Sequence, residues 1–187
     1  LFSVDYSKAV EANYKNNGHH KDRFHLYQAS VYDMPFAKSQ FDKVFCFGVI
    51  QHTPDVYKTV QSLISMAKPG AEVIVDFYCV NGWWTKLQAK YMFRATTFFN
   101  KVGIGRFVNR FIPICDIKGT IPLGLSKQEI REWCILDTFD MFGPEYDQPQ
   151  KVSTVKSWFQ QNGMKEIWGG EIRYDNCVAY VVKGIKI

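Results

Sequence analysis

The pattern of apolar and polar positions changes along the chain, and its first part alternates between strand-like and helix-like segments. The run Val44 to Ile50 is almost continuously apolar with no period-two alternation, which is typical of a strand buried on both faces of a parallel sheet. Apolar residues then recur at helical spacing from Val56 to Ala67, and Lys68-Pro69-Gly70 predicts the end of that helix. Strands alternating with helices indicate a parallel α/β sheet. We expect strands at 1–5, 24–31, 44–49 and 72–80, and helices at 8–16 and, capped by Thr53, at 54–67.

The second part of the chain loses this alternation. Residues 82–150 are rich in aromatic side chains, with helical spacing near the start and a capping box, Ser126 to Glu129, that predicts a helix over 127–135. Residues 136–150 have the composition of a structured loop. A helix over 153–163 and two antiparallel strands, 164–169 and 176–183, complete the expected pattern. We therefore predict a single domain, 1–187, in which 82–150 is a mostly helical insertion that covers the substrate.

Composition and charge narrow the classes of function. The 187 residues suit one soluble domain, and the net charge of +5 is spread along the chain, which disfavours a nucleic-acid partner. Five scattered cysteines indicate a reducing, cytoplasmic location without disulfides, and no metal-ligand spacing occurs. No apolar run is long enough to span a membrane. A basic aromatic helix near Lys90 and Arg94 that touches a membrane surface is the weaker alternative to a substrate cover.

Three segments in order, ASVYDMPF at 29–36, FDKVFCFGVIQHTPD at 41–55 and Lys68-Pro69-Gly70, resemble class I S-adenosylmethionine-dependent methyltransferases. The resemblance is to the small-molecule type related to the ubiquinone and menaquinone biosynthesis methyltransferases. It implies a Rossmann-like α/β fold: a parallel sheet in the strand order 3-2-1-4-5-7-6, helices on both faces and an antiparallel C-terminal edge strand. It also implies S-adenosylmethionine as cofactor and methyl transfer to a small or medium-sized, partly apolar acceptor.

The resemblance places the cofactor at the carboxyl ends of the strands, where open α/β sheets bind ligands. Asp5 would accept hydrogen bonds from the ribose hydroxyls. Ser30 stands where the family has the aspartate that contacts adenine, while Asp33 reads as a turn residue. The expected cofactor-binding residues are Asp5, Ser30, Val31, Tyr32, Phe47, Gly48 and Val49.

The substrate side follows the same strand ends. His52 is a candidate general base, although a histidine that only packs against the pocket fits the sequence equally well. Methyl transfer from a sulfonium needs mainly in-line placement of the reacting atoms. The other substrate-side candidates are Gln51, Trp84, Tyr91, Asp137, Asp140 and Tyr146.

One element of the family pattern does not occur in this sequence: the first strand with its Gly-rich loop. In the family order that strand lies at the centre of the sheet, so the strands ending at Asp5 and Val31 would lack a neighbour. The chain also begins with Leu1, and we therefore expect a segment upstream, a strand from another chain such as a homo-oligomer partner, or a rearranged sheet.

Three readings remain open from the sequence. The first is a methyltransferase acting on a small molecule. The second is a non-catalytic fragment or binding module with the same fold, which cofactor affinity would distinguish. The third is a nicotinamide-dependent oxidoreductase, which Asp5 also fits, but the sequence has no Tyr-x-x-x-Lys pair. Methylation of nucleic acid is disfavoured by the absence of an Asn/Asp-Pro-Pro-Tyr/Phe motif after Val44 to Ile50.

Overall fold

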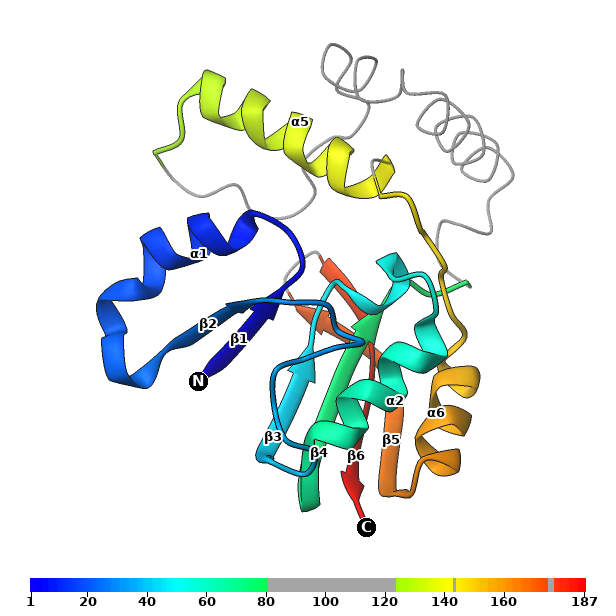
Figure 1. Ribbon diagram of the computed structural model, residues 1–187. Helices are drawn as coiled ribbons and strands as arrows, with labels where there is room; N and C mark the ends of the chain where they lie inside the picture. Colours follow the sequence, from blue (N-terminus) through cyan, green and yellow to red (C-terminus); the bar gives the residue numbers. More distant parts are fainter. Residues whose placement is uncertain (81–123, 143, 175–176) are drawn as a thin grey trace.

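The structure, a computed structural model, describes residues 1–80, 124–142, 144–174 and 177–187 (Figure 1). Its strands form two separate sheets. The smaller one pairs β1 (Phe2–Asp5) with β2 (His25–Gln28) in parallel. Helix α1 (Ala9–Asn17) and the 3-10 helix η1 (Gly18–Arg23) connect these two strands.

The larger sheet has four strands in the order β3-β4-β6-β5. Strands β3 (Phe41–Cys46) and β4 (Ala67–Phe77) run parallel, whereas β6 (Cys177–Lys186) is antiparallel to both β4 and β5 (Met164–Tyr174). The predicted antiparallel C-terminal edge is therefore confirmed. The two sheets together reproduce the expected family order, with one position open between β1 and β3.

The buried core lies on one face of the larger sheet, beneath α2 (Val56–Met66) and α6 (Val152–Gln161) (Figure 1). These helices pack there because their apolar side chains recur at helical spacing and meet alternate residues of β4. The apolar face predicted for the helix over 54–67 is confirmed, because Val56, Val60, Leu63 and Ile64 are buried. The fully buried side chains of this core include Val60, Val73, Val75, Val155, Phe159 and Val182.

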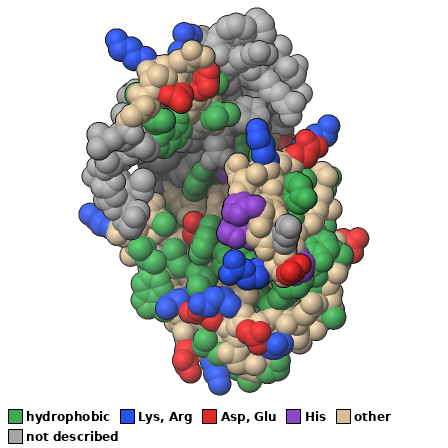
Figure 2. All heavy atoms as spheres, turned by 90° about the vertical axis from the view of Figure 1, so that its left-hand side faces the viewer, with side chains coloured by type: hydrophobic (Ala, Val, Ile, Leu, Met, Phe, Trp, Pro, Cys, Tyr) green, Lys and Arg blue, Asp and Glu red, His purple; other side chains and the backbone are tan. Residues whose placement is uncertain are grey.

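The opposite face of the larger sheet corrects the expectation of a strand buried on both faces. Phe45 and Phe47 are 50% and 53% exposed, although they belong to the apolar run. Within the described parts of the chain, α2 and α6 cover only the other face, and β3 accordingly has half-buried and exposed residues but none that is fully buried. Figure 2, which faces the side that carries β1 and β2, shows hydrophobic side chains at the surface.

An aromatic cluster joins the two sheets at the start of β1 and β3. The Phe36 ring stands edge-on to Phe2, Tyr27 and Phe41, with centroid distances of 5.7, 5.0 and 5.1 Å. Phe2 of β1 also lies 5.3 Å from Phe41 of β3. Aromatic contact, without strand pairing, therefore connects β1 to β3.

Several predicted boundaries move in the structure. The side chain of Asp55, not Thr53, caps α2 by accepting a hydrogen bond from Lys58 N at 3.0 Å. Thr53 Oγ1 instead donates to Ile50 O, at the end of the 3-10 helix η2 (Ile50–His52). Helix α5 (Lys127–Phe142) begins at the predicted capping box and continues through part of the predicted loop.

None of the helices in the described parts of the chain is long and apolar enough to cross a membrane. Cys46 and Cys79 are free thiols. Burial is the main reason that the pKa of Cys46 is raised to about 12, so this thiol is un-ionised at neutral pH.

Candidate functional site

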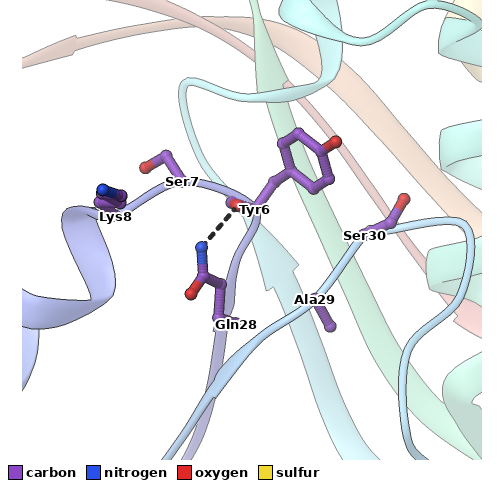
Figure 3. A pocket seen from close by; sticks show the side chains of 6 residues that line it. All are labelled: Tyr6, Ser7, Lys8, Gln28, Ala29 and Ser30. Atoms are coloured by element: carbon purple, nitrogen blue, oxygen red, sulfur yellow. Dashed lines mark hydrogen bonds between the residues drawn. The ribbon is translucent and has the colours of Figure 1, made fainter.

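A cavity of about 540 Å³ lies at the carboxyl ends of β1 and β2. Two chain segments form it, one leaving β1 and one leaving β2, and Gln28 Nε2 donates to the carbonyl of Tyr6 across it at 3.3 Å (Figure 3). Polar backbone and side-chain groups at this edge are what an α/β sheet offers to a nucleotide-like ligand. The lining residues are Tyr6, Ser7, Lys8, Gln28, Ala29 and Ser30.

Asp5 is the last residue of β1 and lies directly before this cavity lining. Its Oδ1 accepts hydrogen bonds from both the amide and the hydroxyl of Ser7, each at 2.7 Å. Its Oδ2 accepts none from the residues that the structure describes. The Ser7 bonds hold the carboxylate in place, and Oδ2 is left available to accept from a ligand hydroxyl.

Ser30, Val31 and Tyr32 follow β2, and each is engaged in local structure. Ser30 Oγ accepts from Tyr32 N at 3.2 Å, which leaves the Ser30 hydroxyl proton free to donate. The carbonyl of Val31 accepts from Ser62 Oγ. The Tyr32 hydroxyl binds both the amide and the carbonyl of Asp55, at 2.9 and 3.0 Å, so it fixes the start of α2.

Phe47, Gly48 and Val49 form the turn after β3, and Gly48 is the position that requires glycine. Its φ is +70°, and a Cβ added there would meet no atom within 4 Å, so the space above Gly48 is open. Phe47 and Val49 are 53% and 45% exposed. This turn offers open backbone at the edge of the sheet.

Asp76 fixes that turn, although it was not among the predicted site residues. Asp76 lies in the neighbouring strand β4, and its Oδ1 accepts a hydrogen bond from Gly48 N at 2.5 Å. Burial raises the pKa of Asp76 above its ordinary value, and the Gly48 amide opposes this shift. The available signal was an acidic residue inside the otherwise apolar run Val73 to Val80.

Gln51 and His52 lie in η2, immediately beyond the turn. The Gln51 side chain is fully buried, and both of its amide atoms lack a hydrogen-bond partner among the described residues. His52 Nδ1 lies 3.1 Å from the carbonyl oxygen of Tyr146, while Nε2 is buried and unpartnered within the same described set. Buried polar atoms of this kind need a ligand, a water or another explanation.

The segment 146–150 brings Tyr146 to this place. Gln148 N donates to the carbonyl of Gln51 at 2.9 Å, and Gln148 Nε2 donates to the carbonyl of Thr53 at 2.7 Å. Gln150 pairs with Tyr78 and Val80 beyond the end of β4. Gln148 was not among the predicted site residues, because a lone glutamine in a loop carries no distinguishing pattern.

The remaining predicted substrate residues divide into two groups. Asp137 and Asp140 lie on helix α5 rather than in a loop, and their side chains fall outside the description. Trp84 and Tyr91 lie outside the described residues altogether. The structure therefore brings the His52 ring and the Tyr146 carbonyl together, and the substrate role of every candidate stays a prediction.

Comparison with known proteins shows what this chain is similar to. A family model described as a methyltransferase domain matches residues 1–75. A solved S-adenosylmethionine-dependent methyltransferase from Methanosarcina mazei superposes with a TM-score of 0.56 at 14% identity, covering 100% of this chain and 81% of that one. Magnesium protoporphyrin IX methyltransferase from Synechocystis, solved with S-adenosylhomocysteine, gives 0.56 at 13% identity, covering 100% and 64%.

Similarity to curated proteins is more local. A Synechococcus protein of uncharacterised function is 24% identical over 150 residues, which are 76% of this chain and 35% of that protein. A tRNA U34 carboxymethyltransferase from Campylobacter curvus is 46% identical over 46 residues, or 25% of this chain and 15% of that enzyme. The chain thus spans about a third or less of the length of these relatives.

The predicted resemblance to class I S-adenosylmethionine-dependent methyltransferases is confirmed by the family match and by the Rossmann-like α/β fold. The quinone-methyltransferase subtype stays a prediction.

Proposed function

We propose that this chain is the greater part of a methyltransferase domain that binds S-adenosylmethionine and transfers its methyl group to a small or medium-sized, partly apolar acceptor. The observation that carries the proposal is the set of groups at the carboxyl ends of β1, β2 and β3. A fixed carboxylate, a 540 Å³ cavity and an open glycine turn occur there together, in a chain whose first 75 residues match a methyltransferase family.

Each part of the cofactor has a chemically suited group. Oδ2 of Asp5 can accept from a ribose hydroxyl, and the hydroxyl of Ser30 can donate to an adenine nitrogen. The residues that flank the adenine would be Val31 and Tyr32. The backbone from Phe47 to Val49 would lie along the amino-acid end of the cofactor, where Gly48 permits close approach. The bound cofactor supplies an electrophilic methyl group.

The open position between β1 and β3 supports a further part of the proposal. Both strands point the same way in Figure 1, and in the described structure each pairs on one side only, β1 with β2 and β3 with β4. A parallel strand from outside these 187 residues would satisfy both edges. The Gly-rich loop that follows such a strand in the family would complete the cofactor site.

Acceptor choice is assigned to the region 82–150, with Trp84, Tyr91, Asp137, Asp140 and Tyr146 as candidate contacts, in a cytoplasmic enzyme. Gln51, whose buried amide has no hydrogen-bond partner among the described residues, is the candidate for binding a polar group of the acceptor. The match to a tRNA U34 carboxymethyltransferase covers only a quarter of this chain, so we do not carry that enzyme's acceptor over and keep the proposal of a small-molecule acceptor. The alternative is a binding module that holds the cofactor without catalysis.

Calorimetric titration with S-adenosylhomocysteine tests the proposal. In the protein at its natural length, Asp5→Ala should weaken binding by about 1–3 kcal/mol through loss of hydrogen bonds to the ribose. The matched control is Asp22→Ala, an exposed acid in η1, which should leave affinity unchanged. Unchanged affinity in Asp5→Ala contradicts the ribose assignment, and absence of binding by the unaltered protein contradicts the function.

A second test measures cofactor binding by the isolated 187-residue chain. Without a Gly-rich loop, it should bind the cofactor only with about millimolar affinity or weaker. Micromolar binding would show that the loop is dispensable. Binding without turnover of any acceptor by the natural-length protein would favour the binding-module alternative.

A further inference from the structure

The Asp76 side chain acts where the backbone pairing of β3 with β4 ends. The parallel register of the two strands ends at Cys46 and Val75. Beyond that pair, Gly48 N donates its hydrogen bond to Asp76 Oδ1 at 2.5 Å instead of to a backbone carbonyl. A carboxylate therefore lies in direct contact with the turn that we assign to the amino-acid end of the cofactor.

Asp76 lies on the face of the larger sheet that α2 and α6 leave uncovered. Val75 and Phe77 are buried in the core on the other face, so Asp76 between them points away from the core and is half-buried. Its Oδ1 is taken by Gly48. Its Oδ2 makes no hydrogen bond to a described residue and is not enclosed by the protein, so it can accept from a ligand.

No positive charge among the described residues balances this carboxylate. Asp76 belongs to none of the ion pairs that these residues form. Val181, its partner across the β4–β6 pair, is apolar, and the Cys46 thiol is un-ionised. Burial raises the pKa of Asp76, which means that its ionised form costs the fold stability. A half-buried carboxylate without a counter-ion, placed at a proposed binding site, points to a positively charged ligand.

We propose that Asp76 is a further cofactor-binding residue, which fixes the Gly48 turn through Oδ1 and pairs through Oδ2 with the positively charged amino group of the cofactor's amino-acid end. An ammonium group donates hydrogen bonds and carries the charge that balances the carboxylate. This inference rests on the proposed function, because it uses the place that the proposal gives to the cofactor.

The Asp76→Asn variant separates the ionic contact from the support of the turn. Asparagine keeps an oxygen that accepts from Gly48 N, so the turn should stay in place, but it removes the negative charge. Amide hydrogen exchange at Gly48 checks that the turn is retained. The two ligands to compare are S-adenosylhomocysteine and its deaminated analogue, in which hydrogen replaces the amino group and the rest of the molecule is the same.

Calorimetric titrations of the natural-length protein give the expected result. Asp76→Asn should weaken the binding of S-adenosylhomocysteine about tenfold, because a charge-assisted contact is lost, and that of the deaminated analogue less than about twofold. The matched control is Glu72→Gln, which removes an acid from the same face of β4 at its other end. It should leave both affinities unchanged.

A second variant keeps the test decisive if asparagine disturbs the turn. Asp76→Ala removes both the charge and the acceptor for Gly48 N, so it should weaken both ligands and still weaken S-adenosylhomocysteine about tenfold more than the analogue. Equal losses on the two ligands in either variant, or unchanged affinity for S-adenosylhomocysteine, overturn the inference. Absence of S-adenosylhomocysteine binding by the unaltered protein would instead count against the proposed function.

Discussion

The two sheets of this molecule differ in how they are held. The four-stranded sheet has a continuous buried core between β4, β6, α2 and α6, with Val60, Val73 and Phe159 fully buried. The β1–β2 sheet has only half-buried or exposed residues, and its helix α1 has none buried. A two-stranded sheet has too little apolar surface to be stable alone. The β1–β2 half, which holds the proposed ribose and adenine contacts, therefore depends on what joins it to the rest.

In the described structure, the aromatic cluster of Phe2, Tyr27, Phe36 and Phe41 joins the strands of the two sheets, and hydrogen bonds that connect Val31 and Tyr32 to α2 and its N-cap add to this link. The fold and the proposed cofactor site therefore do not have the same source of stability. The core of the larger sheet stabilises the fold, and the link between the sheets holds the proposed site in place. Substitutions in the two regions should therefore separate global stability from cofactor binding.

The largest effect is expected in the core of the larger sheet. Phe159→Ala removes a fully buried ring and should lower the free energy of unfolding by about 3–5 kcal/mol, measured by urea denaturation. Phe47→Ala, whose side chain is 53% exposed, is the matched control and should change it by less than about 1 kcal/mol. Equal effects would show that the larger sheet does not hold the main core.

A smaller and more local effect is expected for Phe36→Ala. This ring contacts three others, so its loss should weaken the link between the sheets by about 1–3 kcal/mol. Amide hydrogen exchange should accelerate in β1 and β2 and stay unchanged in β4 and β6. Uniform acceleration would contradict two separately held regions. Phe45→Ala, which removes a stacked and half-exposed ring of β3, is the control.

The next effect concerns Asp76 and has a defined sign with pH. Burial raises the folded-state pKa of Asp76, so the unfolded chain loses this proton first as pH rises. Stability from this group is therefore fully present below the unfolded pKa of about 3.9 and falls as pH rises toward the folded value. Asp76→Asn keeps an oxygen acceptor for Gly48 N and removes the ionisation.

Comparing Asp76→Asn with the unaltered protein isolates the contribution of Asp76. Four other carboxyl groups in the described parts of the chain have lowered pKa values, so their contribution to stability grows as pH rises, but it is the same in both proteins. These groups are Asp42, Glu72, Glu129 and Glu171. The free energy of unfolding of Asp76→Asn, relative to the unaltered protein, should rise between about pH 4 and neutral pH. A difference that is flat or falls with pH would show that Asp76 is not penalised by burial.

The smallest effect is expected at the surface of the larger sheet. Lys43 and Glu72 form an ion pair at 2.8 Å, which lowers the pKa of Glu72. Because the lysine is exposed, Lys43→Ala should cost less than about 1 kcal/mol, and the cost should shrink in high salt. A loss of stability comparable to that of Phe36→Ala would mean that the Lys43–Glu72 ion pair contributes more to stability than its exposure suggests.

The sequence predicted the larger sheet well, because its signals are local and periodic. The inward face of α2, the capping box at Ser126 and the final antiparallel pair each depend on spacing within one segment. The exposure of Phe45 and Phe47 was not predictable, since an apolar run gives no information on whether a second layer covers it. The extension of α5 to Phe142 was missed because the Asp- and aromatic-rich segment reads as a loop by composition alone.

The sequence indicated which residues lie at the candidate site, but it did not indicate their hydrogen-bond partners. Strand ends gave Asp5, Gly48 and His52, but the groups that fix them come from elsewhere in the chain. Asp76 lies 28 residues beyond Gly48, and the Tyr146 carbonyl lies 94 residues beyond His52. Such long-range partners leave no pattern in the sequence, and a backbone carbonyl leaves none at all.

In the proposed site, one cofactor molecule is held by both regions, the end of β1 and the turn after β3. A titration of the ¹⁵N-labelled natural-length protein with S-adenosylhomocysteine, followed by amide chemical shifts, tests this. We expect the amides of Asp5 to Ser7 and of Phe47 to Val49 to shift together, with one common dissociation constant. Shifts confined to one of these groups, or found in neither, would contradict it.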